Sequence, residues 1–343
     1  MSDVLIRTEG RAGRITLNRP QALNAVTHGM CRDIEAALVA WRDDPAVALV
    51  LIDAAGARAF SAGGDIAEMY ATGRAGDFAY GRRFWRDEYR LNARIFEYAK
   101  PVVSFLQGFT MGGGVGIGCH ARLRIVGETS QIAMPECGIG LVPDVGGSMM
   151  LARAPGRIGA WLGTTGARMG PADAILAGFA DAFLPEARWD AVKAAMIATG
   201  RPDLSPVPPP PGRLADLRGA IDRHFAADDL GAILAGLAAD GGDVARETLA
   251  ALRRNAPLSV AATLEMLRRL GPSPDIREAL ALEYRFTYRA MEQGDFLEGI
   301  RAAIIDKDRR PRWRHDAPPD PDEVAAMLAP LGPDELTLGE ATQ

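Results

Sequence analysis

The chain has 343 residues, of which 48% are hydrophobic and 24% charged, and its formal net charge is -5. These proportions resemble those of soluble globular proteins and exclude a disordered or fibrous chain. Nucleic-acid binding needs clustered positive charge, so a mild negative excess argues against it. We therefore expect a folded protein with a sizeable core and no nucleic-acid partner.

The three cysteines, Cys31, Cys119 and Cys137, are widely spaced and odd in number. This pattern favours neither a disulfide framework nor a zinc site, so no metal is expected. Met1 to Arg14 is polar and charged, unlike a signal or transit peptide. No apolar run approaches the ~20 residues needed to span a bilayer. We expect a cytoplasmic protein with no membrane association.

Strand and helix patterns alternate in the first half of the chain. Apolar residues alternate or cluster in two short segments on either side of a turn bounded by glycines, which predicts a β-hairpin. Two fully apolar runs are typical of buried parallel strands. The expected strands are Val4–Thr8, Arg14–Leu17, Ala48–Ile52, Val102–Leu106 and Arg122–Val126, and the expected helices are His28–Arg42 and Gly114–Ala121. This order predicts an α/β fold built from right-handed crossovers.

A proline-rich segment at residues 201–213 separates this first part, residues 1–200, from a helical region at residues 214–343. Consecutive prolines cannot continue a helix or donate to a sheet, so the segment is interpreted as a stiff linker. The expected helices beyond it are Leu214–Phe225, Leu230–Ala239, Val244–Asn255, Leu258–Leu270, Ile276–Met291 and Phe296–Ile305. Ala317–Pro321 and the last dozen residues are expected to be loosely ordered.

A glycine-rich loop, Met111–Gly114, lies between an apolar strand and a predicted helix. Glycines let a ligand approach the main chain closely. Amides at the start of a helix carry partial positive charge and can stabilise an oxyanion on a bound carbonyl. A tight turn that binds nothing explains the loop alone about as well, and both interpretations stay open at this point.

A second glycine-containing loop, Phe60–Ile66, follows the strand at Ala48–Ile52. Loops that follow parallel strands meet at the carboxyl edge of a sheet, where α/β proteins bind ligands. Together the two loops can therefore form a two-donor oxyanion hole. Asp65, within the second loop, is interpreted as a helix N-cap rather than as an acid or base.

Two carboxylates, Glu136 and Asp144, each follow a proline in a segment of apolar and small residues. A poorly solvated carboxylate has a raised proton affinity and can act as acid, base or nucleophile near neutral pH. The alternative is that both are caps or salt-bridge partners. A serine hydrolase is not favoured because no Gly-x-Ser-x-Gly elbow is present, and His120 is interpreted as a packed or surface residue.

Taken together, these loops resemble the crotonase (enoyl-CoA hydratase/isomerase) superfamily. The motifs that carry this resemblance are Asn18–Ala25, Ala59–Ile66 and Met111–Gly114. Within the superfamily the chain is most similar to the 3-hydroxyisobutyryl-CoA hydrolase family. That similarity rests on Met134–Glu136, Ile139–Leu141, Pro143–Gly147, Asp295–Ala302, Ile305–Asp308 and Pro311–Trp313. It implies a crotonase-like ββα spiral core followed by a helical C-terminal region.

The resemblance also implies roles for individual residues. The amides of Gly64 and Gly113 would hold the thioester carbonyl, Glu136 would attack it or activate water, and Asp144 would transfer protons or grip the substrate hydroxyl. Glu88 matches a further acidic position near the acyl group. The residues that match the coenzyme A-lining stretches are Ala22, Leu23, Ala62, Asp65 and Ile66.

Two positions depart from related families. Hydratases carry a glutamate just after the glycines of the oxyanion loop, where this chain has Gly116, so efficient hydration is not expected. Cys137 stands where the hydrolases usually have threonine, beside Glu136.

The leading hypothesis is hydrolysis of a short 3-hydroxyacyl-CoA, above all 3-hydroxyisobutyryl-CoA in valine catabolism, with no cofactor because coenzyme A is part of the substrate. One alternative is an enoyl-CoA isomerase or divergent hydratase, and another is an acyl-CoA-binding protein without activity. Crotonase-like folds often form trimers, yet the helical half has the length to cover the same surface within one chain. A homo-oligomer therefore stays one of two open arrangements.

Overall fold

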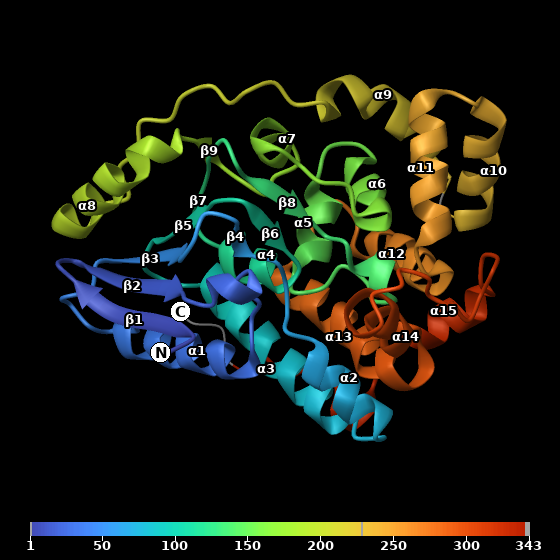
Figure 1. The fold of residues 1–343 in the computed structure, drawn as a ribbon, viewed down its shortest axis with the longest axis horizontal. Helices are drawn as coiled ribbons and strands as arrows, with labels where there is room; N and C mark the ends of the chain where they lie inside the picture. Colours follow the sequence, from blue (N-terminus) through green and yellow to red (C-terminus); the bar gives the residue numbers. More distant parts are fainter. Residues whose placement is uncertain (1, 228, 340–343) are drawn as a thin grey trace.

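The computed structural model describes residues 2–227 and 229–339 (Figure 1). Its larger sheet has six strands, in the order β1 (Val4–Glu9), β2 (Ala12–Leu17), β3 (Leu49–Ala54), β5 (Val102–Leu106), β7 (Leu123–Val126) and β9 (Ala182–Phe183). β1 and β2 form the predicted antiparallel hairpin, and every later neighbour pairs in parallel. The expected α/β class is confirmed.

Helices cover both faces of this sheet, which explains why its inner strands are largely apolar, with Asp53 of β3 and Ser104 of β5 as buried polar exceptions. Successive side chains of β3 alternate between two hydrophobic clusters. Leu49 and Leu51 pack with Trp189 and Met196 of α8 (Trp189–Thr199), whereas Val50 and Ile52 belong to the main core. That main core includes α1 (His28–Arg42) and α3 (Ala79–Phe96).

A second, three-stranded parallel sheet has the order β4 (Ala59–Ser61), β6 (Phe109–Met111) and β8 (Gln131–Ala133). Each of its strands directly follows a strand of the large sheet, so β3–β4, β5–β6 and β7–β8 form successive pairs. Sequence patterns missed these strands because each has only three residues. The glycine loops therefore follow β4 and β6 rather than the longer apolar strands.

Several first-half helices were not predicted. They are α2 (Ala67–Arg74), α3, α5 (Gly147–Arg153), α6 (Ile158–Thr165), α7 (Pro171–Leu176) and α8. Helix α3 matters most, because it is amphipathic and places Glu88 and Asn92, one turn apart, on its buried face. The predicted helix after the glycine loop is shorter than expected, since α4 runs from Gly113 to Gly118.

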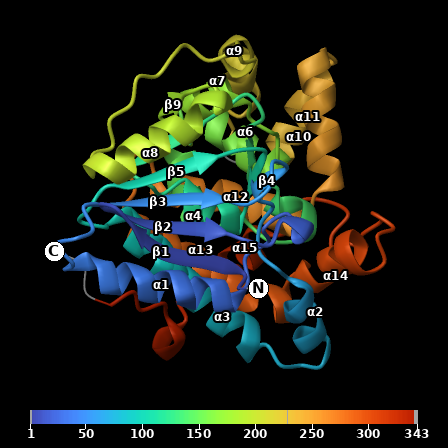
Figure 2. The same cartoon turned by 60° about the vertical axis from the view of Figure 1, so that its left-hand side comes forward.

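The linker has no helix or strand from residue 201 to residue 212 and crosses the top of the molecule in Figure 1. The helices that follow begin and end within a few residues of their predicted bounds. They are α9 (Leu214–His224), α10 (Leu230–Asp240), α11 (Asp243–Arg254), α12 (Pro257–Leu270), α13 (Ile276–Gln293) and α14 (Phe296–Ile300), with a π-helical turn at Arg301–Ile305. In Figure 2 the parallel strands point toward the side on which α11 and α14 lie.

This helical region packs directly against the first half and shares its core. Phe296 of α14 packs on Trp85 of α3, with ring centroids 5.5 Å apart, and Tyr284 of α13 lies 6.1 Å from Tyr89. None of the helices in the described part of the chain is long and apolar enough to cross a membrane.

Loose order was expected at Ala317–Pro321 and over the last dozen residues, and it stays a prediction; the described part of the last dozen residues contains the 3-10 turn Gly332–Asp334. Helix α15 (Pro321–Met327) is capped by Asp320, and Leu336 is buried. Arg90 and Arg277 donate hydrogen bonds to the carbonyls of Thr337 and Gly339. The tail has few apolar residues, but arginines on α3 and α13 bind its backbone. Residues 340–343 lie outside the described residues.

Candidate active site

The two glycine loops meet beside the small sheet because β4 and β6 are parallel neighbours. A Cβ atom placed on Gly113 would lie only 3.3 Å from the amide nitrogen of Gly64. Gly63 and Gly112, which precede these residues, have φ angles of 116° and 48°, a region that favours glycine. Neither the Gly64 nor the Gly113 amide donates to another described residue. The two amides therefore lie close together, as an oxyanion hole formed by both would require.

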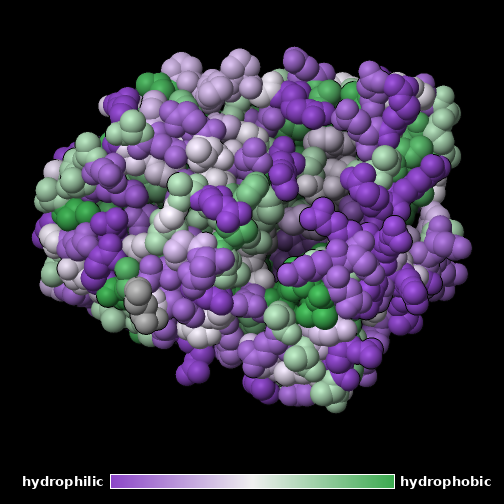
Figure 3. All heavy atoms as spheres, in the orientation of Figure 1, coloured by the Kyte–Doolittle hydropathy of each residue, from purple (hydrophilic) through white to green (hydrophobic). Residues whose placement is uncertain are grey.

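Three carboxyl groups, from Glu88, Glu136 and Asp144, line a cavity of about 240 Å³ together with these loops. They come from separate elements: α3, the 3-10 turn Glu136–Ile139 after β8, and the loop before α5. The face drawn in Figure 3 is mostly hydrophilic, with a hollow near its middle that hydrophobic residues border.

Two of the carboxyl groups touch the glycine loops. A Cβ on Gly112 would lie 2.9 Å from Glu136 Oε1, and a Cβ on Gly113 would lie 2.7 Å from Glu88 Oε1. Glycine at these positions leaves room for a bound carbonyl between the amides and the carboxyls. Glu88 Oε1 and Glu136 Oε2 are buried and have no hydrogen-bond partner among the described residues. Unpaired buried oxygens are costly, which is consistent with groups reserved for a ligand.

The three carboxyl groups differ in proton affinity. Burial, and then the charge of Asp144, raise the pKa of both Glu88 and Glu136 well above the usual range. Burial also raises the pKa of Asp144, to about 7, although a hydrogen bond from the Tyr89 hydroxyl (2.7 Å) opposes this rise. All three pKa values are therefore shifted upward by burial, and the hydrogen bond from Tyr89 favours the ionised form of Asp144.

Two residues that the sequence reasoning missed fix the position of Asp144. Tyr89, one residue after Glu88, donates to Asp144 Oδ2. Glu283 of α13 accepts hydrogen bonds from the amides of Gly146 (2.8 Å) and Ser148 (3.0 Å) and from the Ser148 hydroxyl. Burial raises the pKa of Glu283 to about 8. A glutamate on the apolar face of a predicted helix was the signal available in the sequence.

Gly116 faces a closed surface. A Cβ there would lie 2.7 Å from Asn92 Nδ2 and 2.8 Å from the Val145 Cβ. The structure therefore has no room for a carboxylate at the position where hydratases carry one. Cys137 is also remote from the cavity, since its thiol lies 3.3 Å from the carbonyl oxygen of Gly163 and 3.4 Å from Thr263 Oγ1.

The expected coenzyme A-lining residues divide into two groups. Ala62 and Ile66 line the cavity, whereas Ala22, Leu23 and Asp65 do not. The Leu23 carbonyl accepts from the Ala62 amide (3.0 Å) and so supports the wall from behind.

The interpretation of Asp65 as a helix N-cap is wrong. Helix α2 has Ile66 at its N-cap, and no side chain caps it. The Asp65 carboxylate instead binds the Arg19 guanidinium at 3.0 Å. This ion pair joins two of the motifs found in the sequence.

The apolar wall of the cavity was not predicted. It is formed by residues of α2, α3 and the C-terminal region, namely Met69, Phe84, Trp85, Phe296 and Ile304. The helical region therefore completes the cavity as well as covering the core. The arrangement as a whole can polarise a carbonyl, exchange protons among carboxyls and exclude water from an acyl group.

The family model for enoyl-CoA hydratase/isomerase matches residues 12–327. The chain belongs to the enoyl-CoA hydratase/isomerase family. A Gallus gallus member, the mitochondrial 3-hydroxyisobutyryl-CoA hydrolase, is 36% identical over 360 residues, which cover 98% of this chain and 91% of the relative. This confirms the resemblance to the crotonase superfamily and to its 3-hydroxyisobutyryl-CoA hydrolases, and the chain is an enzyme of that superfamily.

Two solved structures of this family have closely similar folds. An enoyl-CoA hydratase from Rhodobacter sphaeroides 2.4.1 is 65% identical, with a TM-score of 0.96 over 98% of this chain and 100% of that one. A carnitinyl-CoA dehydratase from Mycobacterium thermoresistibile is 41% identical, with a TM-score of 0.93 over 98% of this chain and 99% of that one. These relatives are named for different reactions, but each name contains a coenzyme A thioester.

Proposed function

We propose that this enzyme hydrolyses a short 3-hydroxyacyl-CoA thioester, with 3-hydroxyisobutyryl-CoA as its principal substrate. The observation that carries the proposal is the set of buried carboxyls beside two free amides, in a cavity where Gly116 admits no further carboxylate. The name of the Gallus gallus relative supports the same substrate. The products would be coenzyme A and 3-hydroxyisobutyrate, an intermediate of valine catabolism.

In the first half of the reaction, the thioester carbonyl accepts hydrogen bonds from the Gly64 and Gly113 amides. Glu136 passes its proton to ionised Asp144 and attacks the carbonyl carbon, and the two amides stabilise the resulting oxyanion. The tetrahedral intermediate then collapses, the C–S bond breaks, and Asp144 returns the proton to the departing thiolate. The acyl group is left on Glu136 as a mixed anhydride.

In the second half, water attacks the anhydride, Asp144 accepts one proton of the water, and Glu136 is released as a carboxylate while the other proton stays with the acid product. Asp144 then returns its proton to Glu136, which restores the starting state. A one-step route in which Glu136 activates water uses the same residues. Glu88 lies beside Gly113 with an unpaired oxygen. We assign it to the substrate hydroxyl, because a buried polar group discriminates strongly against a substrate that lacks its partner.

The test is thiol release from 3-hydroxyisobutyryl-CoA by the wild-type enzyme and by Glu136→Gln. The expected result is rapid release by the wild type and a large loss in the variant, which keeps the size of the side chain. Release by the variant at the wild-type rate would contradict the assignment of Glu136.

A second candidate is hydration or isomerisation of an enoyl-CoA, which the name of the 65% identical structure favours. This reaction changes the absorbance of the conjugated double bond without releasing thiol. A panel of enoyl-CoA and 3-hydroxyacyl-CoA substrates, followed by both signals, separates the two functions.

A further inference from the structure

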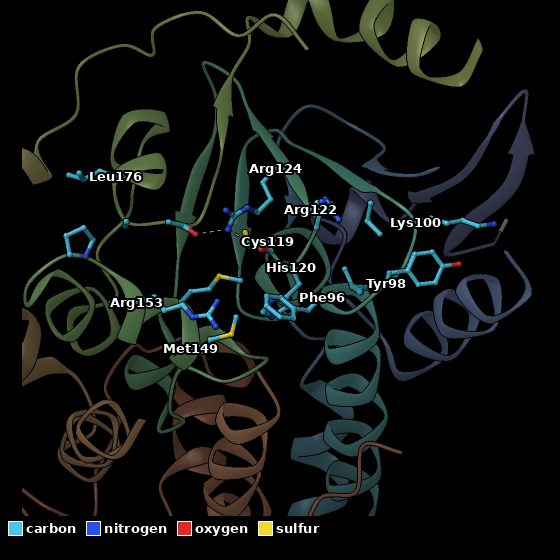
Figure 4. A pocket seen from close by; sticks show the side chains of 17 residues that line it. Phe96, Tyr98, Lys100, Cys119, His120, Arg122, Arg124, Met149, Arg153 and Leu176 are labelled. Carbon is cyan, nitrogen blue, oxygen red and sulfur yellow. Dashed lines mark hydrogen bonds between the residues drawn. The ribbon is translucent and has the colours of Figure 1, made fainter. Parts of the chain in front are cut away.

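A second cavity, of about 470 Å³, lies at the C-terminal end of α4, away from Gly113 (Figure 4). It opens between the end of α3, helix α5 and the segment that follows α7. Among the described residues, its lining contains no acidic side chain and four arginine or lysine side chains, Lys100, Arg122, Arg124 and Arg153. A cationic pocket is notable in a chain whose net charge is -5.

Two of these cations are already bound. Arg124 pairs with Asp181 at 2.5 Å. Lys100 donates to the carbonyls of Trp41 and Asp44, and its ammonium group extends away from the other basic residues in Figure 4.

The other two, Arg122 and Arg153, are exposed, and neither has a carboxylate partner in the described part of the chain. Arg153 donates one hydrogen bond, to the carbonyl of Pro274 at 2.6 Å. A guanidinium group has five N–H donors, so both arginines retain donors for an anion.

The same pocket offers an apolar surface. Phe96 is 41% exposed, its ring stands edge-on to His120 at 6.0 Å, and the Arg153 guanidinium lies 5.9 Å from its centroid. Met149 and Leu176 also line the cavity. The volume is within the range of about 300–1,000 Å³ that is typical of small-molecule sites.

We propose that this pocket binds a small organic anion, with a carboxylate or phosphate head between Arg122 and Arg153 and an apolar body against Phe96 and Met149. The site is separate from the acyl-CoA cavity. His120 and Val145 form the wall between them: His120 Nε2 donates to the Val145 carbonyl at 2.6 Å, and Val145 lines the acyl-CoA cavity. Burial lowers the pKa of His120 to about 4, so the imidazole is neutral and Nε2 carries the proton.

The experiment is isothermal titration of the full-length protein with three probes that share a phenyl ring: phenyl phosphate, benzoate and uncharged benzyl alcohol. Each titration is run without coenzyme A and again with coenzyme A present, so that binding in the two cavities can be compared. Binding of either anion, but not of the alcohol, is expected, and the two anions show whether phosphate or carboxylate is preferred.

Arg122→Glu should weaken binding about tenfold or more, because the substitution replaces a charge-assisted donor with a carboxylate that repels the anion. Arg122 is exposed, so the variant should fold, and its melting temperature checks this. Arg223→Glu is the matched control, since Arg223 is exposed on α9 and outside this pocket. Phe96→Ala should weaken phenyl phosphate but leave inorganic phosphate unchanged.

Two results would overturn the proposal: no binding of either anion, or equal affinity in wild type and Arg122→Glu. Equal affinity would assign the phenyl anions to another site, because Arg122 lines this pocket and not the acyl-CoA cavity. Neither of these outcomes bears on thiol release, so the proposed hydrolysis is tested independently.

Discussion

The first half of the chain and its helical C-terminal region contribute to the acyl-CoA cavity in different ways. The first half supplies the polar groups: the Gly64 and Gly113 amides and the carboxyls of Glu88, Glu136 and Asp144. The C-terminal region supplies part of the apolar wall, through Phe296 and Ile304. It also supplies Glu283, which accepts hydrogen bonds from the loop that carries Asp144. Chemistry thus depends on short loops near one sheet, whereas their position depends on helices far away in the sequence.

The largest effect is expected from a change in the first half, Gly113→Ala. The new methyl group would lie 2.7 Å from Glu88 Oε1 and 3.3 Å from the Gly64 nitrogen, where the substrate carbonyl is expected. The N–H at position 113 is kept, but the methyl group blocks the carbonyl from reaching it, so kcat should fall by about as much as on loss of one oxyanion donor, about 100- to 1000-fold in the thiol-release assay.

Gly219→Ala on α9 is the matched control, because a Cβ there meets nothing within 4 Å. The control should retain full activity. A Gly113→Ala enzyme that is as active as this control would show that the glycine loop only packs, as its simplest interpretation from sequence allows.

A change in the C-terminal region, Glu283→Gln, should have the next largest effect. The amide keeps the shape of the side chain but cannot accept all the hydrogen bonds from Gly146 and Ser148, and each buried donor left unpaired costs about 1–3 kcal/mol. We expect a lower melting temperature, because the unpaired donors destabilise the fold. If the loop moves and displaces Asp144, kcat should also fall by about ten- to a hundredfold. KM should change little.

Glu292→Gln on the same helix is the control, since its carboxylate is 48% exposed and pairs with Arg82 at the surface. Two results would argue against a positioning role for Glu283. One is a rise in KM as large as the fall in kcat in Glu283→Gln, and the other is the same fall in kcat in Glu283→Gln and Glu292→Gln.

Removal of a single hydroxyl, in Tyr89→Phe, should have a smaller effect that depends on pH. The hydrogen bond from Tyr89 stabilises ionised Asp144, so its loss should raise the pKa of Asp144 further above about 7. If ionised Asp144 accepts the proton, the acid limb of the kcat–pH profile should shift to higher pH. The shift should be about one pH unit, because one pKa unit corresponds to ~1.4 kcal/mol. The lost rate should return at higher pH. A uniform loss at all pH values would instead indicate a disturbed geometry.

The comparison of the two regions also explains what the sequence could predict. The strands, α1 and the C-terminal helices follow from periodicity, and Glu136 and Asp144 stand out because apolar residues surround them. The glycine-containing loops predicted a two-donor oxyanion hole, and the family resemblance assigned its donors to Gly64 and Gly113. Glu283 and Tyr89 did not stand out, because each is part of an otherwise ordinary helix and acts only through a tertiary contact. The three-residue strands of the small sheet were too short for any periodic signal.

The smallest expected effect concerns stability rather than rate. The folded-state pKa of Asp144, about 7, is above the usual value of 3.8, so folding favours its protonated form. The stability that follows from this shift is fully present below the unfolded pKa and is lost as the pH rises through about 7. Asp144→Asn removes this dependence. The melting temperature of the wild type, relative to the variant, should therefore fall by several degrees between about pH 4 and pH 8.

The control is Asp203→Asn in the linker, whose carboxylate is 72% exposed and should show no such trend. A constant difference between wild type and Asp144→Asn across this range would mean that Asp144 is as well solvated as a surface carboxylate, and the first half of the site would then lack its proton acceptor of intermediate pKa.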